Sequence, residues 1–183
     1  MTHIAKPRPP IHGLLAEFHT PEAVLAAAER AHKEGYRHLD AYSPYSVEGL
    51  SDAIGFHHTR LPMIVLTGGI IGCIGGFSLQ FWGSTTYYAL NIGGRPFNSW
   101  PAFVPITFEC TVLVAAFTTV LGMLALNGLP MPYHQVFNVP EFVFASRDKF
   151  FLAIEATDPL FSREGTKKFL HSLSPDGVFE VDH

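Results

Sequence analysis

The chain has 183 residues, a formal net charge of −4 and two cysteines. Its length suits one small domain and a further segment, and its acidic balance excludes the basic surface of nucleic-acid-binding proteins. Charged residues make up 15% of the chain, well below the roughly 25% found in soluble domains, so part of it is unusually apolar.

The first part of the chain, residues 11–60, is predicted to form a strand, a helix and a second strand. Ile11–Phe18 is apolar and bounded by turn residues, as expected of a strand. Thr20 is a suitable N-cap for the helix, and Gly35 suits the left-handed geometry of a helix end. Tyr36–Ala41 is the second predicted strand, and a turn and a short helix follow it.

An uncharged stretch, Pro62–Trp82, predicts the first transmembrane helix. A helix of about 20 residues spans the bilayer core. The alternative, the core helix of a soluble protein, would normally keep a polar stripe, and this stretch has none. It lies too far along the chain for a signal peptide, and the N-terminal MTHIAKPRPP lacks the apolar centre of one.

Within this helix, Gly68, Gly72 and Gly76 recur at four-residue intervals. This spacing places them on one face, where small residues allow a second helix to approach closely. We therefore predict a helix-packing face, whose partner is either the second span or another chain. The second span offers small residues that could complement it: Thr111, Ala115, Thr118 and Gly122.

The second predicted span contains one charged residue, Glu109, in the otherwise apolar Phe103–Leu126. A carboxylate in lipid costs about 2.5–3.5 kcal/mol on insertion scales. Three interpretations remain open for Glu109: a protonated carboxyl bonded to another helix, a member of a proton path, or a side chain that reaches water at the interface. All three predict that it faces protein rather than lipid.

The distribution of lysine and arginine predicts the orientation of the two spans. Residues 1–60 carry six, the segment between the spans carries only Arg95, and the chain after Leu126 carries five. Because such residues concentrate on the cytoplasmic side, both termini are predicted in the cytoplasm and the loop in the periplasm. Trp82 and Trp100 flank this loop, as an aromatic belt would.

The last part of the chain repeats the plan of the first, with a strand at Lys149–Ala156, a helix from Ser162 to about Leu173, and a strand at Gly177–Asp182. Two βαβ halves predict an α+β, ferredoxin-like domain with helices on one face of a four-stranded sheet. The transmembrane hairpin is then inserted between the halves. The alternative is two unrelated tails, but each half alone has too little core.

The predicted boundaries are 11–60 for the first cytoplasmic βαβ half with its short helix, 61–82 for the first transmembrane helix, 83–101 for the periplasmic loop, 102–126 for the second transmembrane helix, 127–148 for a cytoplasmic connector and 149–183 for the second cytoplasmic βαβ half.

The chain lacks the motifs of common cofactor sites. No histidine lies in either predicted span, which excludes a haem held there by histidines of this chain. There is no CxxCH motif, and Cys73 and Cys110 are too few for an iron–sulfur cluster. Neither a GxGxxG nor a P-loop pattern occurs. We therefore predict no cofactor, metal or catalytic residue in this chain.

Several stretches carry a more specific pattern: LDAYSPYSVEGL, RLPMIVLTGGIIGCIGGFSLQ, NIGGRPFNSWPAFVPITFECTVL, GMLALNGLPMPYH and FNVPEFVFASRDKFFLAIEATDP. Together they resemble the D-subunit (ActD) family of alternative complex III, a bacterial quinol:electron-acceptor oxidoreductase unrelated to cytochrome bc1. The resemblance extends over residues 11–182, and the long central stretch makes it specific.

The resemblance implies a two-span subunit of the bacterial inner membrane, with a cytoplasmic domain and no redox cofactor of its own. It implies partner subunits in a respiratory or photosynthetic chain. Haems c and iron–sulfur clusters would lie on periplasmic subunits, and a large multi-span subunit would oxidise quinol. The electrons would pass to a cytochrome c, a small copper protein or an oxidase.

Three hypotheses for function follow. The first is a non-catalytic subunit that stabilises the assembly, with its glycine face on multi-span partners and its cytoplasmic domain at the inner side of the complex. The second is an active role in proton translocation through Glu109. The third is a membrane-tethered sensor of a small ligand, which rests on analogy with other ferredoxin-like domains alone.

Overall fold

The computed structural model describes residues 10–183 and divides into two compact units. The first, called here the sheet domain, combines the described residues up to His57 with Pro132–His183. The second, called the hairpin, is His58–Met131. The N-terminal segment in which no signal peptide was predicted lies, apart from Pro10, outside the described residues.

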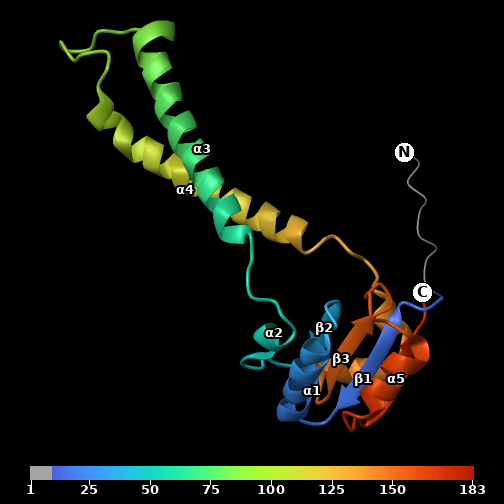
Figure 1. Ribbon diagram of the computed structural model, residues 1–183. Helices are drawn as coiled ribbons and strands as arrows, with labels where there is room; N and C mark the ends of the chain where they lie inside the picture. Colours follow the sequence, from blue (N-terminus) through green and yellow to red (C-terminus); the bar gives the residue numbers. More distant parts are fainter. Residues whose placement is uncertain (1–9) are drawn as a thin grey trace. The chain divides into compact units, whose positions relative to one another are not determined.

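The sheet domain contains four antiparallel strands in the order β2-β3-β1-β4 (Figure 1). They are β1 (Gly13–Phe18), β2 (Leu39–Tyr42), β3 (Phe150–Glu155) and β4 (Gly177–Val181). Each half of the domain contributes one central and one edge strand, so neither half forms the sheet alone. The predicted ferredoxin-like domain, split by an inserted helical hairpin, is confirmed.

Helices α1 (Pro21–Glu34) and α5 (Arg163–His171) cover one face of this sheet, with the short α2 (Leu50–Ala53) beside α1 (Figure 1). The predicted ends of α1 are confirmed: the Thr20 hydroxyl accepts the Ala23 N–H at 3.2 Å, and Gly35 follows the helix with φ 105°. The core of this face includes Leu14, Phe18, Val24, Leu152, Ile154 and Leu170, all essentially without solvent exposure.

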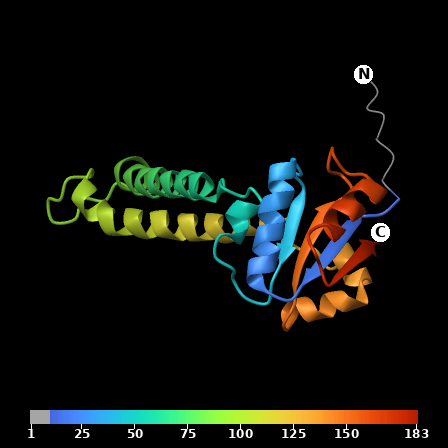
Figure 2. The same ribbon diagram turned by 60° about the horizontal axis from the view of Figure 1, so that its bottom comes forward.

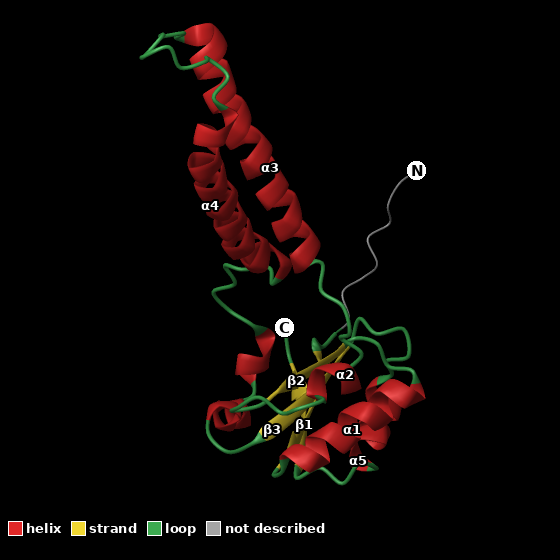
Figure 3. Ribbon diagram, turned by 90° about the vertical axis from the view of Figure 1, so that its left-hand side faces the viewer, coloured by secondary structure: helices red, strands yellow, loops and turns green. Residues whose placement is uncertain are grey.

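The opposite face of the sheet is covered by η2 (Gln135–Asn138) and η3 (Pro140–Ser146) (Figure 3). Both lie in the segment predicted as a connector, and the prediction had placed helices on one face only. The central strands explain the difference. Because β1 and β3 are almost continuously apolar, they need cover on both faces.

The two halves are also joined by polar contacts. The Asp158 carboxylate, after β3, accepts the N–H groups of Arg37 at 2.6 Å and His38 at 2.9 Å. The Tyr36 and Thr166 hydroxyls share a buried hydrogen bond of 3.1 Å. Because two backbone N–H groups bond to a side chain, β2 begins at Leu39 rather than at the predicted Tyr36.

The hairpin consists of α3 (Leu61–Trp82), continued by one π-helical turn η1 (Gly83–Tyr87), and α4 (Trp100–Leu126) (Figure 2). The two helices lie side by side along most of their length. Both are long and apolar enough to cross a membrane. Few of their residues are buried within the chain, unlike those of a soluble core helix.

Candidate functional site

The three predicted packing glycines lie on α3 where it meets α4. Gly68, Gly72 and Gly76 are the buried residues of α3. A methyl group added at Gly72 would lie 2.6 Å from the Cys110 carbonyl oxygen, and one at Gly68 would clash with the Thr118 side chain. The glycine face is therefore filled by the second helix of the same chain.

The residues suggested as complements on α4 lie along this contact. Thr118 opposes Gly68, and a methyl group added at Gly69 would lie 3.9 Å from the side chains of Thr111 and Ala115. Gly122 lies against Leu61 and Ile64. The hydroxyls of Thr111 and Thr118 donate to carbonyl groups four residues earlier in α4, so they need no partner outside the helix.

Gln80 is the polar link between the helices, and the sequence interpretation had not singled it out. Its amide nitrogen, with two N–H groups to share, lies within hydrogen-bonding distance of three acceptors: the Gly76 and Phe103 carbonyl oxygens, each at 3.1 Å, and the Thr107 hydroxyl at 3.2 Å. Gly76 is on the same helix, whereas Phe103 and Thr107 are on α4. This contact near the loop end fixes how the two helices meet in a region that is otherwise apolar.

Glu109 lies on α4 and is exposed rather than buried between the helices. Within residues 10–183, its carboxylate has neither a hydrogen bond nor an ion pair with another side chain. The structure thus separates Glu109 from the packing glycines. A charge in this position has no compensation from the residues that the structure describes.

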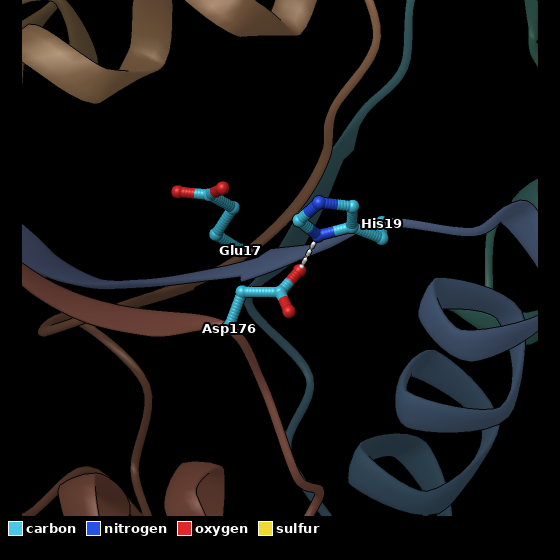
Figure 4. Close-up of side chains that lie close together, drawn as sticks. All are labelled: Glu17, His19 and Asp176. Carbon is cyan, nitrogen blue, oxygen red and sulfur yellow. Dashed lines mark hydrogen bonds and ion pairs between the residues drawn. The ribbon is translucent and has the colours of Figure 1, made fainter.

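A cluster of charged side chains lies at one end of the sheet (Figure 4). Glu17, His19 and Asp176 place potential metal-ligand atoms within 4.8 Å of one another, and His19 bonds to Asp176. The Lys149 ammonium already contacts the Glu17 carboxylate at 2.8 Å and the His19 ring at 2.8 Å. A metal ion would have to compete with this ammonium, so the arrangement is best described as an ion-pair network.

A second titratable group lies at the other end of β1. Burial lowers the pKa of His12, whose ring lies 5.5 Å from that of His134. Burial, and then the charge of Glu155, raise the pKa of Asp40. The adjoining cavity measures only about 10 Å³, which is room for one water. The pKa values of His12 and Asp40 are therefore shifted, but the cavity beside them has no space for a substrate.

Comparison with known proteins gives the family. Residues 12–180 match the family described as alternative complex III, ActD subunit. The chain belongs to the ActD family. No curated protein matches it in sequence. An ActD subunit is part of a membrane complex, so the environment of its two apolar helices is lipid together with partner subunits.

Family membership changes how the exposed residues of this ActD subunit are interpreted. Side chains that would be unfavourable in water, such as Phe108 and Leu113 of α4, are exposed on the hairpin. Lipid accommodates them, but not Glu109. The predicted site residues therefore form two separate features. The glycine face packs against α4 of the same chain, whereas the Glu109 carboxylate has no partner among the described residues.

Proposed function

We propose that this chain is a non-catalytic, cofactor-free subunit that stabilises alternative complex III by docking its hairpin on a multi-span partner. The observation that carries the proposal is Glu109, a carboxyl group exposed on a membrane helix without a partner in the described residues. Exposure to lipid would cost about 2.5–3.5 kcal/mol. A hydrogen-bond donor on a helix of another subunit removes this cost.

The surroundings of the titratable groups support a non-catalytic role. In the sheet domain, the Glu17 and Lys149 side chains are paired with each other, and Asp158 accepts three backbone hydrogen bonds. The cavity beside His12 is too small for a substrate. Quinol oxidation and the c-type haems and iron–sulfur clusters would then belong to the partner subunits.

The distribution of basic residues supports a cytoplasmic sheet domain. Eleven of the twelve lysine and arginine residues lie outside the segment that joins the spans, which carries Arg95 alone. We therefore place both chain ends in the cytoplasm and the loop between α3 and α4 in the periplasm of the bacterial inner membrane.

A second candidate function is a contribution to proton translocation. The same observation motivates it, because a carboxyl group within a membrane complex can take up and release a proton. The two functions differ in what Glu109 must do. A packing contact needs only a hydrogen bond, whereas a proton path needs a group that titrates.

Two substitutions separate these functions in the complete complex. Glu109→Gln keeps hydrogen bonding and removes titration, whereas Glu109→Leu removes both. If Glu109 is a packing contact, the Leu variant lowers the yield of haem-containing complex purified through a tag on this chain, and the Gln variant keeps yield, quinol oxidation and proton release. Val120→Leu, an exposed apolar position further along α4, is the control.

Each outcome decides between the proposals. If the Leu variant assembles with native yield and thermal stability, Glu109 does not dock on a partner, and the stabilising contact is refuted. If the Gln variant assembles normally but loses proton release in proteoliposomes, the proton path is supported. If the Gln variant behaves like the native complex there, the proton path is eliminated.

A further inference from the structure

The loop between η1 and α4 contains a feature that neither proposed role of Glu109 uses. Arg95 is the only Asp, Glu, Lys or Arg between Arg60 and Glu109. It lies in the most specific stretch of the sequence, NIGGRPFNSWPAF. Its guanidinium is the one fixed positive charge in this region of the sequence, and such a group can pair with an anion.

The loop holds the Arg95 side chain in place through its own hydrogen bonds. The Arg95 Nε donates to the Ser99 hydroxyl at 2.7 Å, and this hydroxyl donates to the Pro96 carbonyl oxygen at 2.5 Å. Ser99 is buried, with 8% of its surface exposed. Gly94 has φ 75°, and its N–H donates to the Asn91 side chain at 3.1 Å, which closes the turn before Arg95.

Arg95 lines a pocket of about 220 Å³. Its polar lining includes the hydroxyl-bearing Ser84, Tyr88 and Ser99, and its apolar lining includes Leu90 and Phe103. Apart from the bond through Nε, the Arg95 guanidinium has no hydrogen bond or ion pair within residues 10–183. Its two terminal amino groups can therefore both donate to one ligand, the geometry that guanidinium groups use for phosphate.

The pocket lies at the end of the hairpin where a membrane gives way to water. α3 and η1 end on one side of it, and α4 begins on the other. Trp82 and Trp100 are exposed here, and the Trp82 ring stacks on Tyr87 at 4.9 Å. Tryptophan and tyrosine concentrate at the level of lipid headgroups.

We propose that this pocket binds the phosphate of an anionic phospholipid headgroup. Arg95 supplies the charge and two donors, and the Ser84 and Tyr88 hydroxyls supply further donors. The exposed side chains of Leu90 and Ile92 contact the upper part of the acyl chains. The site requires that the hairpin cross the membrane, but it does not depend on what Glu109 does.

The position of the tryptophans allows a direct test with the full chain. Both tryptophans of the protein flank this pocket, so their fluorescence reports on this end of the hairpin. The chain is reconstituted in phosphatidylcholine vesicles that contain increasing amounts of brominated phosphatidylglycerol, which quenches nearby tryptophan. One arginine near a membrane surface contributes about 1 kcal/mol, so we expect roughly a fivefold preference for the anionic lipid over phosphatidylcholine.

Two arginine variants identify the source of the preference. Arg95→Gln should lower it to about one, whereas Arg60→Gln, at the opposite end of α3, should leave it unchanged. A second, milder variant, Ser84→Ala with Tyr88→Phe, removes two donors but keeps the Arg95–Ser99 bond, and should lower the preference partly. Circular dichroism of each variant checks that the helices remain formed.

Three results would overturn the proposal. One is a preference that survives Arg95→Gln. Another is the absence of any preference in the native chain, which would show that the pocket does not select an anionic lipid. The third combines two observations. Inorganic phosphate changes the tryptophan emission of the native chain in detergent but not that of Arg95→Gln, and the native chain shows no preference for the anionic lipid. The pocket would then bind free phosphate.

Discussion

The sheet domain and the hairpin of this ActD subunit bury their residues in opposite ways. In the sheet domain, large apolar side chains fill two clusters, one on each face of the sheet. In α3 the buried residues are three glycines, and in α4 the buried residue is Phe103. The sheet domain therefore has bulky side chains in its interior, whereas the contact between the two helices is made by residues with little or no side chain.

This contrast reflects the two solvents. In water, burying apolar side chains is itself favourable, by about 25 cal/mol per Å². In lipid that driving force is absent, and helices associate through close packing and interhelical hydrogen bonds. Removing volume should therefore damage the sheet domain, and adding volume should damage the hairpin.

The largest effect is expected from Phe142→Ala in η3. Phe142 is buried and packs against the rings of Tyr42 and Phe151, at 5.0 and 5.5 Å. Its truncation should lower the free energy of unfolding of the sheet domain by about 3–5 kcal/mol. Chemical unfolding of the full chain in detergent, followed by far-ultraviolet circular dichroism, measures it.

The neighbouring Val143→Ala serves as the control, because Val143 is 64% exposed. It should change the free energy of unfolding by less than about 0.5 kcal/mol. Equal effects at the two positions would mean that η3 is not part of the core. The sheet domain would then have a hydrophobic cluster on one face of the sheet only.

A smaller effect is expected from Asp158→Asn, which tests how the two halves of the sheet domain are joined. Burial acts to raise the pKa of Asp158, but the N–H groups of His38, Arg37 and Leu160 together hold this pKa below its usual value of 3.8. An amide replaces one acceptor oxygen with a donor and should destabilise the domain by about 1.5–3 kcal/mol near neutral pH.

The stabilisation by the Asp158 carboxylate should decrease in acid. Since the pKa is lower in the folded than in the unfolded state, the carboxylate contributes its full stability above pH 3.8, and the contribution is lost as the pH falls through the folded value. Unfolding curves of the native and Asp158→Asn chains should thus converge in acid. A difference that stays constant below pH 3.8 would show that the charge of Asp158 does not matter.

The hairpin is tested by adding a single methyl group. In Gly72→Ala the new Cβ would meet the Cys110 carbonyl oxygen at 2.6 Å, a backbone atom that cannot move alone. We expect a loss of about 1–3 kcal/mol from overpacking. Gly75→Ala makes the same change where nothing lies within 4 Å, and should be neutral or slightly stabilising because alanine favours helices.

Unfolding by dodecyl sulfate in mixed micelles, followed by tryptophan emission, measures both glycine variants. If Gly72→Ala and Gly75→Ala unfold together, the helices in the membrane do not meet through the glycine face. The glycines would then be available to a partner subunit, as the sequence alone also allowed.

Features encoded by a few neighbouring residues could be predicted from the sequence. Thr20 and Gly35 mark the ends of α1 because each satisfies backbone groups locally. The hydrophobic lengths predicted both helices of the hairpin. Ser162 stands at the predicted N-cap of α5, but its hydroxyl does not cap the helix; its N–H donates to the Thr166 hydroxyl instead.

Features that depend on contacts between distant residues could not be predicted in this way. The segment around Phe142 has neither helical nor strand periodicity, so nothing local revealed that it covers the sheet. The surroundings of Glu109 could not be predicted for another reason. The protein that it was predicted to face would belong to a partner subunit, whose sequence is not part of this chain. Gln80 was overlooked because a polar residue in an apolar helix does not indicate which helix it bonds to.

Gln80 is also where the smallest effect is expected. Replacing it with Leu removes the hydrogen bonds to Phe103 and Thr107 of α4 while keeping a side chain of similar size. Interhelical hydrogen bonds in membranes contribute about 0.6 kcal/mol on average and up to about 1.7. The loss should therefore be below that of Gly72→Ala, measured in the same micelle titration.

The exposed Ser78→Ala is the control for this last substitution, because it removes a hydroxyl from α3 without touching the contact. Thr107→Val should give part of the loss of Gln80→Leu, since it removes one acceptor and leaves the Phe103 carbonyl. If Gln80→Leu instead stabilises the hairpin, close packing alone holds these helices together. The hairpin would then differ from the sheet domain only in the small size of its buried residues, and the hydrogen bonds of Gln80 would not contribute to its stability.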